Sequence, residues 1–378
     1  MGVIINQSVK NMMTTYAGFG LGALNTLFLY TYFLDQQYYG LVSFLLSAAN
    51  LMWPFMAFGV HSTIVKFFSS YKTKEEKDKL LNLALILPLA ISLILGVIGH
   101  FTYEFLLDYF SDGNELVKPY VWLIYLLAIA TAYFEIFFAW AKIYYKSVFG
   151  NFMKEVVHRL GTTILLFLVY FEVLEADNFM YGVGVVFLFR LLVMGAYAFK
   201  LHRPSLKFSF PSNLSRVLKY TALILIAASV ATALLDLDKV MIESYLPIEN
   251  VAIYGIGIYI ATVISVPQKA MHQITNPITA EYLNTRNFEK LEDLYKKSSI
   301  NLSIVSALIF ILIITNVHTL YKLIPEEYSL SILIVLLISL VKLYDNVLAI
   351  NNSILFNSDY YRLVLAIGVL LVILAFLL

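Results

Sequence analysis

The sequence predicts an all-α membrane protein, a polytopic helix bundle built from two related lobes. The chain of 378 residues is 60% hydrophobic and 13% charged, whereas a soluble domain of this size exposes far more charge. Its apolar stretches are long enough to cross a bilayer as helices, and they lack the alternation that a membrane β-barrel requires. Lipid also forces backbone polar groups to pair within each segment, which favours helices.

We predict eleven membrane-spanning helices, which in chain order are 12–34, 41–65, 80–107, 119–141, 156–175, 179–200, 216–245, 251–280, 296–317, 329–355 and 361–378. The first follows a short polar stretch, and no small-residue cleavage site comes after it, so we interpret it as a retained helix. The longest polar connections are 69–79, 142–155 and 201–215. None is long enough for a soluble domain, so function must reside in the helix bundle.

Basic residues gather in every second connection. Twenty of the 26 Lys and Arg residues lie near Lys10, within 66–79, 142–159, 200–219 and 286–297, and at Arg362. The other connections hold only Lys118 and Lys322. Cytoplasmic loops carry an excess of Lys and Arg, so the N-terminus and the basic connections are predicted to face the cytoplasm, and the end of the chain to face outward.

Composition excludes several classes of site. A formal net charge of +1 gives no support for nucleic-acid binding, and the absence of cysteine rules out disulfides and thiolate chemistry. No glycine-rich phosphate loop and no metal-ligand spacing is present, so we expect no cofactor. The connections on the outer side are short and nearly free of basic residues, which argues against a membrane enzyme such as a polysaccharide polymerase or ligase.

The chain divides at 201–215, a stretch with two prolines and four serines that is typical of a linker. We therefore predict an N-terminal lobe of six helices at 1–200 and a C-terminal lobe of five at 216–378. Both lobes begin with a long helix, a short outer turn and a Tyr-Gly pair, at Tyr39 and Tyr254. Repeats of this kind place the substrate between the copies near mid-bilayer. The second copy is one helix short, so we expect a truncated lobe, with a genuine eleven-helix protein as the alternative.

Several motifs recur in a characteristic order, namely Tyr39-Gly40, Ala57-Phe58-Gly59-Val60, Lys66-Phe67-Phe68, Leu237-Asp238-Lys239, Ile253-Tyr254-Gly255 and Asn276-Pro277-Ile278. Over essentially the whole chain they resemble the oligosaccharide flippase family of the multidrug/oligosaccharidyl-lipid/polysaccharide exporter superfamily, whose members usually have twelve or fourteen spans. The resemblance implies a bacterial inner-membrane flippase that moves polyprenyl-diphosphate-linked oligosaccharide to the outer leaflet by alternating access. Such a flippase serves O-antigen (lipopolysaccharide), capsule or exopolysaccharide biosynthesis, with polysaccharide assembly proteins as candidate partners.

Charged residues at membrane depth are candidates for function because they are costly there. Arg190 lies midway along the sixth span, where it must face a cavity, an anionic ligand or a partner from another helix. The purely structural alternative is a fixed ion pair with Glu135 of the fourth span. In the seventh span, Asp236, Lys239 and Glu243 share a helical face and form either a self-satisfied ladder or a polar stripe lining the cavity.

Other charges extend this set. Asp238 lies on a different face of the seventh span, and either it or Asp236 is a candidate to bind a coupling proton or sodium ion. Lys342 and Asp345 are three residues apart in the tenth span. Lys269 lies in the eighth span, where the alternative is that it extends toward the cytoplasmic interface.

Taken as a set, the four cations within the spans favour an anionic substrate. We predict that Arg190, Lys239, Lys269 and Lys342 attract a diphosphate in a cavity of low dielectric constant. A neutral or cationic drug gains nothing from four buried cations. The four cations thus favour an anionic lipid-linked substrate over the alternative function, which is an ion-coupled multidrug exporter of the same superfamily.

Overall fold

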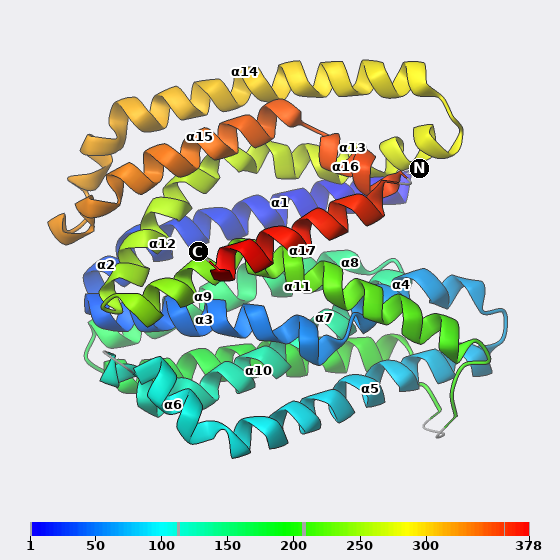
Figure 1. Cartoon of the computed structure of the whole chain (residues 1–378), viewed down its shortest axis with the longest axis horizontal. Helices are drawn as coiled ribbons and strands as arrows, with labels where there is room; N and C mark the ends of the chain where they lie inside the picture. The colour runs from blue at the N-terminus through cyan, green and yellow to red at the C-terminus, as the bar shows by residue number, and fades with distance from the viewer. Residues whose placement is uncertain (1, 112–113, 206–208, 359, 378) are drawn as a thin grey trace.

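The computed structural model describes residues 2–111, 114–205, 209–358 and 360–377, and every regular element among them is helical. Figure 1 shows the helices running roughly side by side along the long axis of the molecule. This arrangement confirms the predicted all-α membrane bundle. Part of the predicted linker, residues 206–208, lies outside the described residues. The division into lobes at 1–200 and 216–378 stays a prediction.

Six helical passes make up the N-terminal half. They are α1 (Gly2–Leu24) with η1 (Asn25–Leu29) and α2 (Tyr30–Phe33); α3 (Gln36–Ala57) with α4 (Val60–Phe67) and η2 (Phe68–Ser70); α5 (Lys74–Phe101) with α6 (Tyr103–Ser111); η3 (Glu115–Tyr120) with α7 (Val121–Ile143); α8 (Ser147–Phe152) with η4 (Met153–Val157) and α9 (His158–Tyr170); and α10 (Ala176–Leu201).

Five passes follow in the C-terminal half. They are α11 (Leu214–Tyr245); α12 (Glu249–Thr262) with η5 (Val263–Ser265) and α13 (Val266–Asn284); α14 (Phe288–Tyr321); η6 (Glu326–Ser331) with α15 (Ile332–Leu348) and α16 (Asn351–Asn357); and α17 (Tyr361–Leu377).

Among the described residues, eight helices are long and apolar enough to cross a membrane by length and composition. The other three predicted spans are also helical but are short or interrupted. The span at 12–34 contains the π-helical turn η1, the span at 156–175 begins inside the π-helical turn η4, and the last one contains a shorter apolar helix, Leu363–Ala375.

Helix limits depart from the predicted ones where polar residues continue a helix into the expected connection. The predicted connection at 142–155 contains all of α8, so the fifth pass begins at Ser147. Likewise α14 begins at Phe288 rather than at 296, and the Asn287 side chain caps its first turn by accepting a hydrogen bond from the Lys290 N–H. Charged side chains that the sequence places in loops therefore belong to helices.

A break separates α3 from α4 at two residues with left-handed backbone, Phe58 and Gly59. A β-carbon at Gly59 would lie 2.3 Å from the carbonyl oxygen of Thr221 in α11. Glycine here serves two needs at once, the positive φ and the close approach of the two backbones. The break therefore lets α11 of the C-terminal half pack directly on the second pass.

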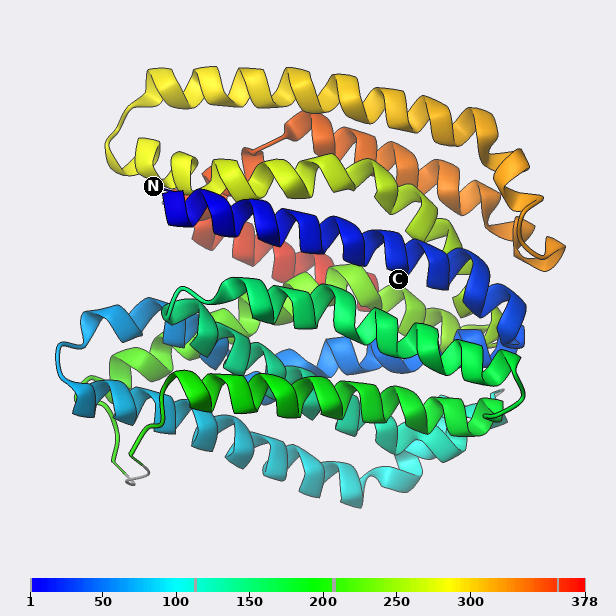
Figure 2. The same cartoon turned by 180° about the vertical axis from the view of Figure 1, so that it is seen from behind.

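The two ends of the bundle differ in charge. We call the end that carries residues 66–79, 142–155 and 209–214 the basic end, and the end that carries residues 35–40 and 246–250 the far end. Figure 1 shows the connections of the basic end together on the right and those of the far end on the left. Figure 2 shows the same molecule from behind, where α1, α9 and α10 lie side by side on one outer face.

Two hydrophobic cores lie at different depths. The first extends inward from the far end and draws residues from both halves, including Tyr39, Ile256 and Val335. The second lies toward the basic end and comprises N-terminal elements together with Val217 at the start of α11. In the described part of the chain, the far-end core thus draws on several helices of both halves, whereas the core toward the basic end takes from the C-terminal half only residues at the start of α11.

Candidate functional site

The far end is sealed by contacts between the two halves. Gly40 of α3 approaches Ile248 so closely that a β-carbon would lie 2.0 Å from its carbonyl oxygen. Ile248 donates its backbone N–H to Asn114 Oδ1 at 2.9 Å, and the Asn114 amide donates to the carbonyl of Glu243 at 2.8 Å. Gln37 donates to Glu249 at 2.8 Å. Backbone contact and buried hydrogen bonds together close this end.

Charges on α11 lie between this seal and the middle of the bundle. Lys239 and Asp236 are 4.0 Å apart, and Asp236 is within hydrogen-bond reach of Ser47 and Asn50 of α3. Asp238 accepts a hydrogen bond from Tyr254 of α12, on a different face as expected.

Glu243 does not continue the predicted ladder. It is 1% exposed and lies beside Asn114, and its Oε2 has no hydrogen-bond partner within the described residues. The 236–239–243 ladder therefore ends at Lys239. Spacing of four along a helix permits a pair, but Glu243 lies beside Asn114, which precedes η3 and bonds to the Glu243 carbonyl at the seal.

A cluster of ionisable groups lies inside the N-terminal half. Lys154 of η4 donates to Glu135 of α7 at 2.7 Å, and Lys142 and His61 lie within electrostatic range of the same carboxylate. The guanidinium of Arg190 lies 4.3 Å from the ring centre of Phe134 and 4.5 Å from that of Phe187.

Arg190 lies inside the N-terminal half, packed against Phe134 and Phe187. The residue is 5% exposed, and its Nε has no hydrogen-bond partner within the described residues. The expected alternative partner, Glu135, is bonded to Lys154. Among the described residues, the Arg190 side chain lies between two aromatic rings and forms no ion pair with Glu135, which is only within electrostatic range. The predicted role of Arg190 in substrate binding stays a prediction. The rings supply cation–π attraction in place of an anion.

Cations from the two halves meet across a cavity of about 100 Å³. Its charged lining residues are Glu155 and Arg159 of the fifth pass and Lys269 of α13. One face of α1 closes the cavity through Met12, Thr15, Tyr16 and Phe19. We call this space the inter-half cavity.

Charge in the inter-half cavity is only partly compensated. Glu155 forms an ion pair with Arg159 at 3.0 Å and also lies within electrostatic range of Lys269, so one carboxylate faces two cations of the lining. Lys342 of α15 is within electrostatic range of Lys269. The cavity and its surroundings therefore favour a negatively charged group.

The predicted site residues thus fall into separate groups. Lys269 and Lys342 lie near one another, Lys239 pairs with Asp236 on α11, and Arg190 lies inside the N-terminal half. The backbone carbonyl of Asp345 accepts a hydrogen bond from Gln268 at 3.1 Å.

Two basic residues described above, Lys154 beside Glu135 and Arg159 in the inter-half cavity, are not among the predicted site residues. Lys154 and Arg159 fall, by sequence, in a basic connection and at its border rather than in a site. The spacing of four between Glu155 and Arg159 is the available signal, since it is typical of a helical ion pair and extends the helix backward into the supposed loop.

Known proteins give two matches. The family model described as "Polysaccharide biosynthesis protein" matches residues 7–279. Among solved structures, the MATE multidrug transporter DinF-BH superposes with a TM-score of 0.56 at 14% sequence identity, covering 94% of this chain and 85% of that one. At this identity the likeness establishes the fold alone. No curated protein matches the sequence.

Proposed function

Because this chain belongs to the polysaccharide biosynthesis protein family, we propose that it moves polyprenyl-diphosphate-linked oligosaccharide across the membrane. The direction proposed is from the cytoplasmic leaflet to the outer leaflet, in the service of cell-surface polysaccharide assembly. The basic end is then the cytoplasmic end, in keeping with the excess of Lys and Arg there.

The inter-half cavity is the observation that carries this proposal. Arg159 and Lys269 approach it from opposite halves, and Lys342 lies within electrostatic range of Lys269. A diphosphate carries charge and several acceptor oxygens, and charge-assisted hydrogen bonds to phosphate are among the stronger polar interactions in proteins. Because the cations come from both halves, a bound diphosphate would hold those halves together.

Alternating access provides the mechanism. The far end is sealed by Gly40 against Ile248 and by Asn114, which bonds to the end of α11 and to the turn before α12. The core toward the basic end, in contrast, includes from the C-terminal half only residues at the start of α11. This difference between the two ends supports a carrier that accepts its substrate from the basic end. Release requires the far end to separate while the basic end closes around the diphosphate.

Drug export is the alternative, since the similar solved structure is a multidrug transporter. The two functions share a fold, so the fold does not choose between them. The charge of the inter-half cavity favours transport of an anionic lipid-linked oligosaccharide. A cationic drug next to Lys269 and Lys342 would be repelled in a medium of low dielectric constant.

The test uses the full chain in proteoliposomes that contain polyprenyl-diphosphate-linked oligosaccharide labelled on the glycan. The fraction of glycan accessible to an external glycosidase should redistribute faster with the protein than without it. Lys269→Gln should slow this redistribution, on the order of tenfold, if it removes about one charge-assisted contact. Lys322→Gln, which changes an exposed lysine of the far end, is the matched control.

Two results would decide against the proposal. Redistribution no faster than in protein-free vesicles would exclude flipping of this substrate. Uptake of a cationic dye against its gradient, with no effect of Lys269→Gln on the lipid-linked glycan, would favour the multidrug exporter.

A further inference from the structure

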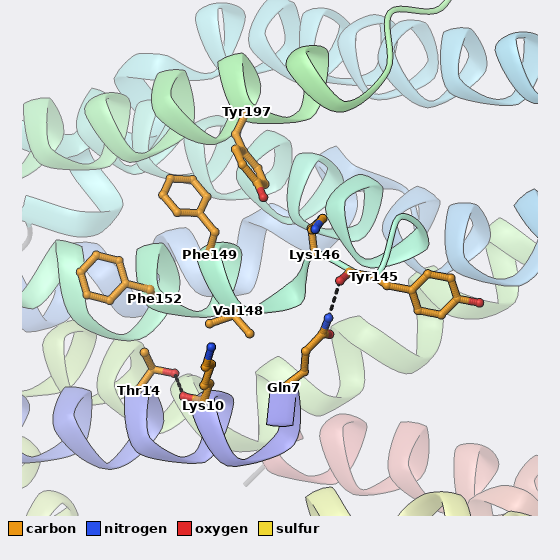
Figure 3. Close-up of a pocket in the computed structure, with 9 residues that line it drawn as sticks. All are labelled: Gln7, Lys10, Thr14, Tyr145, Lys146, Val148, Phe149, Phe152 and Tyr197. Atoms are coloured by element: carbon orange, nitrogen blue, oxygen red, sulfur yellow. Dashed lines mark hydrogen bonds between the residues drawn. The ribbon is translucent and has the colours of Figure 1, made fainter. Parts of the chain in front are cut away.

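A second basic pocket lies on the outer face of the N-terminal half, at the basic end. It has a volume of about 570 Å³ and lies between α1, the 145–146 connection, α8 and α10. Figure 3 shows the nine residues that line it, which are Gln7, Lys10, Thr14, Tyr145, Lys146, Val148, Phe149, Phe152 and Tyr197. The volume is within the range of small-molecule and cofactor sites.

This pocket is separate from the inter-half cavity. Its α1 residues are Gln7, Lys10 and Thr14, whereas the α1 residues of the cavity run from Met12 to Phe19 on the other side of the helix. At 3.6 residues per turn, these two sets occupy opposite faces of α1. Figure 2 shows the helices that form the pocket on the outer surface of the bundle, where a bilayer would surround them.

The charge of the pocket is uncompensated. Lys10 and Lys146 are both exposed, no acidic residue lines the pocket, and neither lysine forms an ion pair among the described residues. The two amines come from different elements, α1 and the connection before α8, and Figure 3 shows both beside the hollow. Two cations with no carboxylate between them favour an anion with more than one acceptor oxygen.

The framework around the lysines is held by hydrogen bonds. Gln7 donates to the carbonyl of Tyr145 at 2.6 Å, and Asn11 donates to Ser147 at 3.0 Å. Asn151 of α8 donates to the carbonyl of Asn11 at 3.0 Å. Tyr145 itself has left-handed backbone, and its N–H donates to the carbonyl of Lys142 at 2.9 Å, which fixes the connection at the end of α7. The pocket is thus built before any ligand arrives.

Apolar side chains form the rest of the wall. The rings of Phe149 and Tyr197 have centres 4.4 Å apart, Phe152 is 39% exposed, and Val148 lies between them and α1. A small soluble anion has no apolar group that could pack against these side chains. A phospholipid fits the pocket, because its phosphate and its glycerol and proximal acyl groups require a basic part and an apolar part next to each other.

We propose that this pocket binds the headgroup of an anionic glycerophospholipid, with the phosphate between Lys10 and Lys146 and the glycerol region against Phe149, Phe152 and Tyr197. The basic end puts these residues at the headgroup level of one leaflet, which is where such a lipid is available. The bound lipid would brace α1 against α8 on the face opposite the inter-half cavity. This inference concerns lipid binding and does not depend on the identity of the transported substrate.

The test measures lipid retention on the purified full chain in detergent, titrated with phosphatidylglycerol or phosphatidylcholine and observed by native mass spectrometry. Phosphatidylglycerol should bind in preference to phosphatidylcholine. The double variant Lys10→Gln/Lys146→Gln should weaken phosphatidylglycerol binding on the order of tenfold, because each lysine near a membrane surface contributes appreciably to attraction for anionic lipid. Lys72→Gln/Lys74→Gln removes the same charge from two exposed lysines of the basic end and should leave binding unchanged.

Three outcomes would overturn the proposal. Equal binding by the double variant and the wild type would exclude the pocket, and equal loss in both double variants would mean that only net charge matters. Displacement of phosphatidylglycerol by millimolar inorganic phosphate or pyrophosphate would identify a soluble phosphate as the ligand. If the glutamine variant fails to fold, Lys10→Arg/Lys146→Arg, which keeps the charge, should retain binding while single glutamine variants show intermediate loss.

Discussion

Lys154 donates a hydrogen bond to Glu135 at 2.7 Å and so occupies the carboxylate expected as the partner of Arg190. Arg190 is left between two aromatic rings, within electrostatic range of Glu135 and Glu155 but bonded to neither. The cluster therefore has one direct ion pair and a second cation held by rings. Its balance depends on Glu135, which is the carboxylate that Lys154, Lys142 and Arg190 have in common.

The first prediction concerns this ion pair. Glu135→Ala should destabilise the protein because it leaves the neighbouring cations without their shared carboxylate, whereas Glu135→Ala/Lys154→Ala should recover part of the loss. We expect a coupling free energy of about 1–2 kcal/mol in a double-mutant cycle, measured by reversible unfolding in mixed micelles. It should stay below that of a fully buried pair, because the Lys154 side chain is 42% exposed.

The Lys296–Glu292 pair of α14 is the control for this cycle. Both of its side chains are about two-thirds exposed, at 66% and 65%, so the same cycle should give no measurable coupling. Equal coupling for the two pairs would contradict a special role of Glu135 inside the N-terminal half.

The second prediction separates packing from charge at Arg190. Arg190→Ala should lower the free energy of unfolding by about 2–4 kcal/mol, because it empties the space between Phe134 and Phe187. Arg190→Met refills much of that space and should cost less. If Arg190 serves packing, transport per folded molecule should survive in Arg190→Met. A folded but inactive Arg190→Met protein would mean that the cation itself is required.

The third prediction concerns the far-end seal. Gly40→Ala puts a β-carbon 2.0 Å from the Ile248 carbonyl, so the two backbones must separate. The chain has no cysteine, so a single Val117→Cys reporter in the buried far-end core can be labelled with a membrane-impermeant maleimide. Gly40→Ala should raise its labelling rate several-fold.

Gly255→Ala is the matched control for the seal. A β-carbon at Gly255 meets nothing within 4 Å, so labelling of the Val117→Cys reporter should stay at the level of the parent protein. A Gly40→Ala protein that labels no faster than Gly255→Ala would show that the far end accommodates the extra carbon without opening.

The fourth prediction concerns sidedness. Single cysteines at the exposed positions Glu75, Tyr145, Phe210 and Phe288 should react with an impermeant reagent only after the cells are made permeable. Cysteines at Lys118 and Lys322, which belong to the far-end connections, should react in intact cells. Labelling of any position of the first set from outside would reverse or break the predicted orientation of the helices around it.

The order of the helical passes is predictable from the sequence because each long apolar stretch forms a helix, but the helix ends are not, since α8 and the start of α14 extend into polar stretches. Features of the backbone within a helix are not predictable in this way. The π-helical turns at Asn25–Leu29 and Met153–Val157 and the left-handed pair at Phe58 and Gly59 depend on neighbours far away in sequence, such as Thr221. Gly59 is recognisable as part of a motif, but its spatial partner is not.

The charges show the same limit. Spacing of three or four residues correctly suggests the Asp236–Lys239 contact, and it separates Asp238 from that face. It cannot pair Lys154 with Glu135, because the two residues lie on different helices and only packing brings them together. The sequence identifies Arg190 as a charge within a span, but residue spacing does not predict that its guanidinium lies against the rings of Phe134 and Phe187.

The core shared by both halves at the far end sets the behaviour of the idle protein. Separating the two halves at that end would expose side chains such as Tyr39, Ile256 and Val335 to water. Exposing one large apolar side chain to water costs about 1.5–3 kcal/mol. Several such side chains together make spontaneous opening rare unless binding of cargo offsets the cost. The proposed carrier would therefore stay closed at the far end while it has no cargo, and ions would not leak through it between one transport cycle and the next.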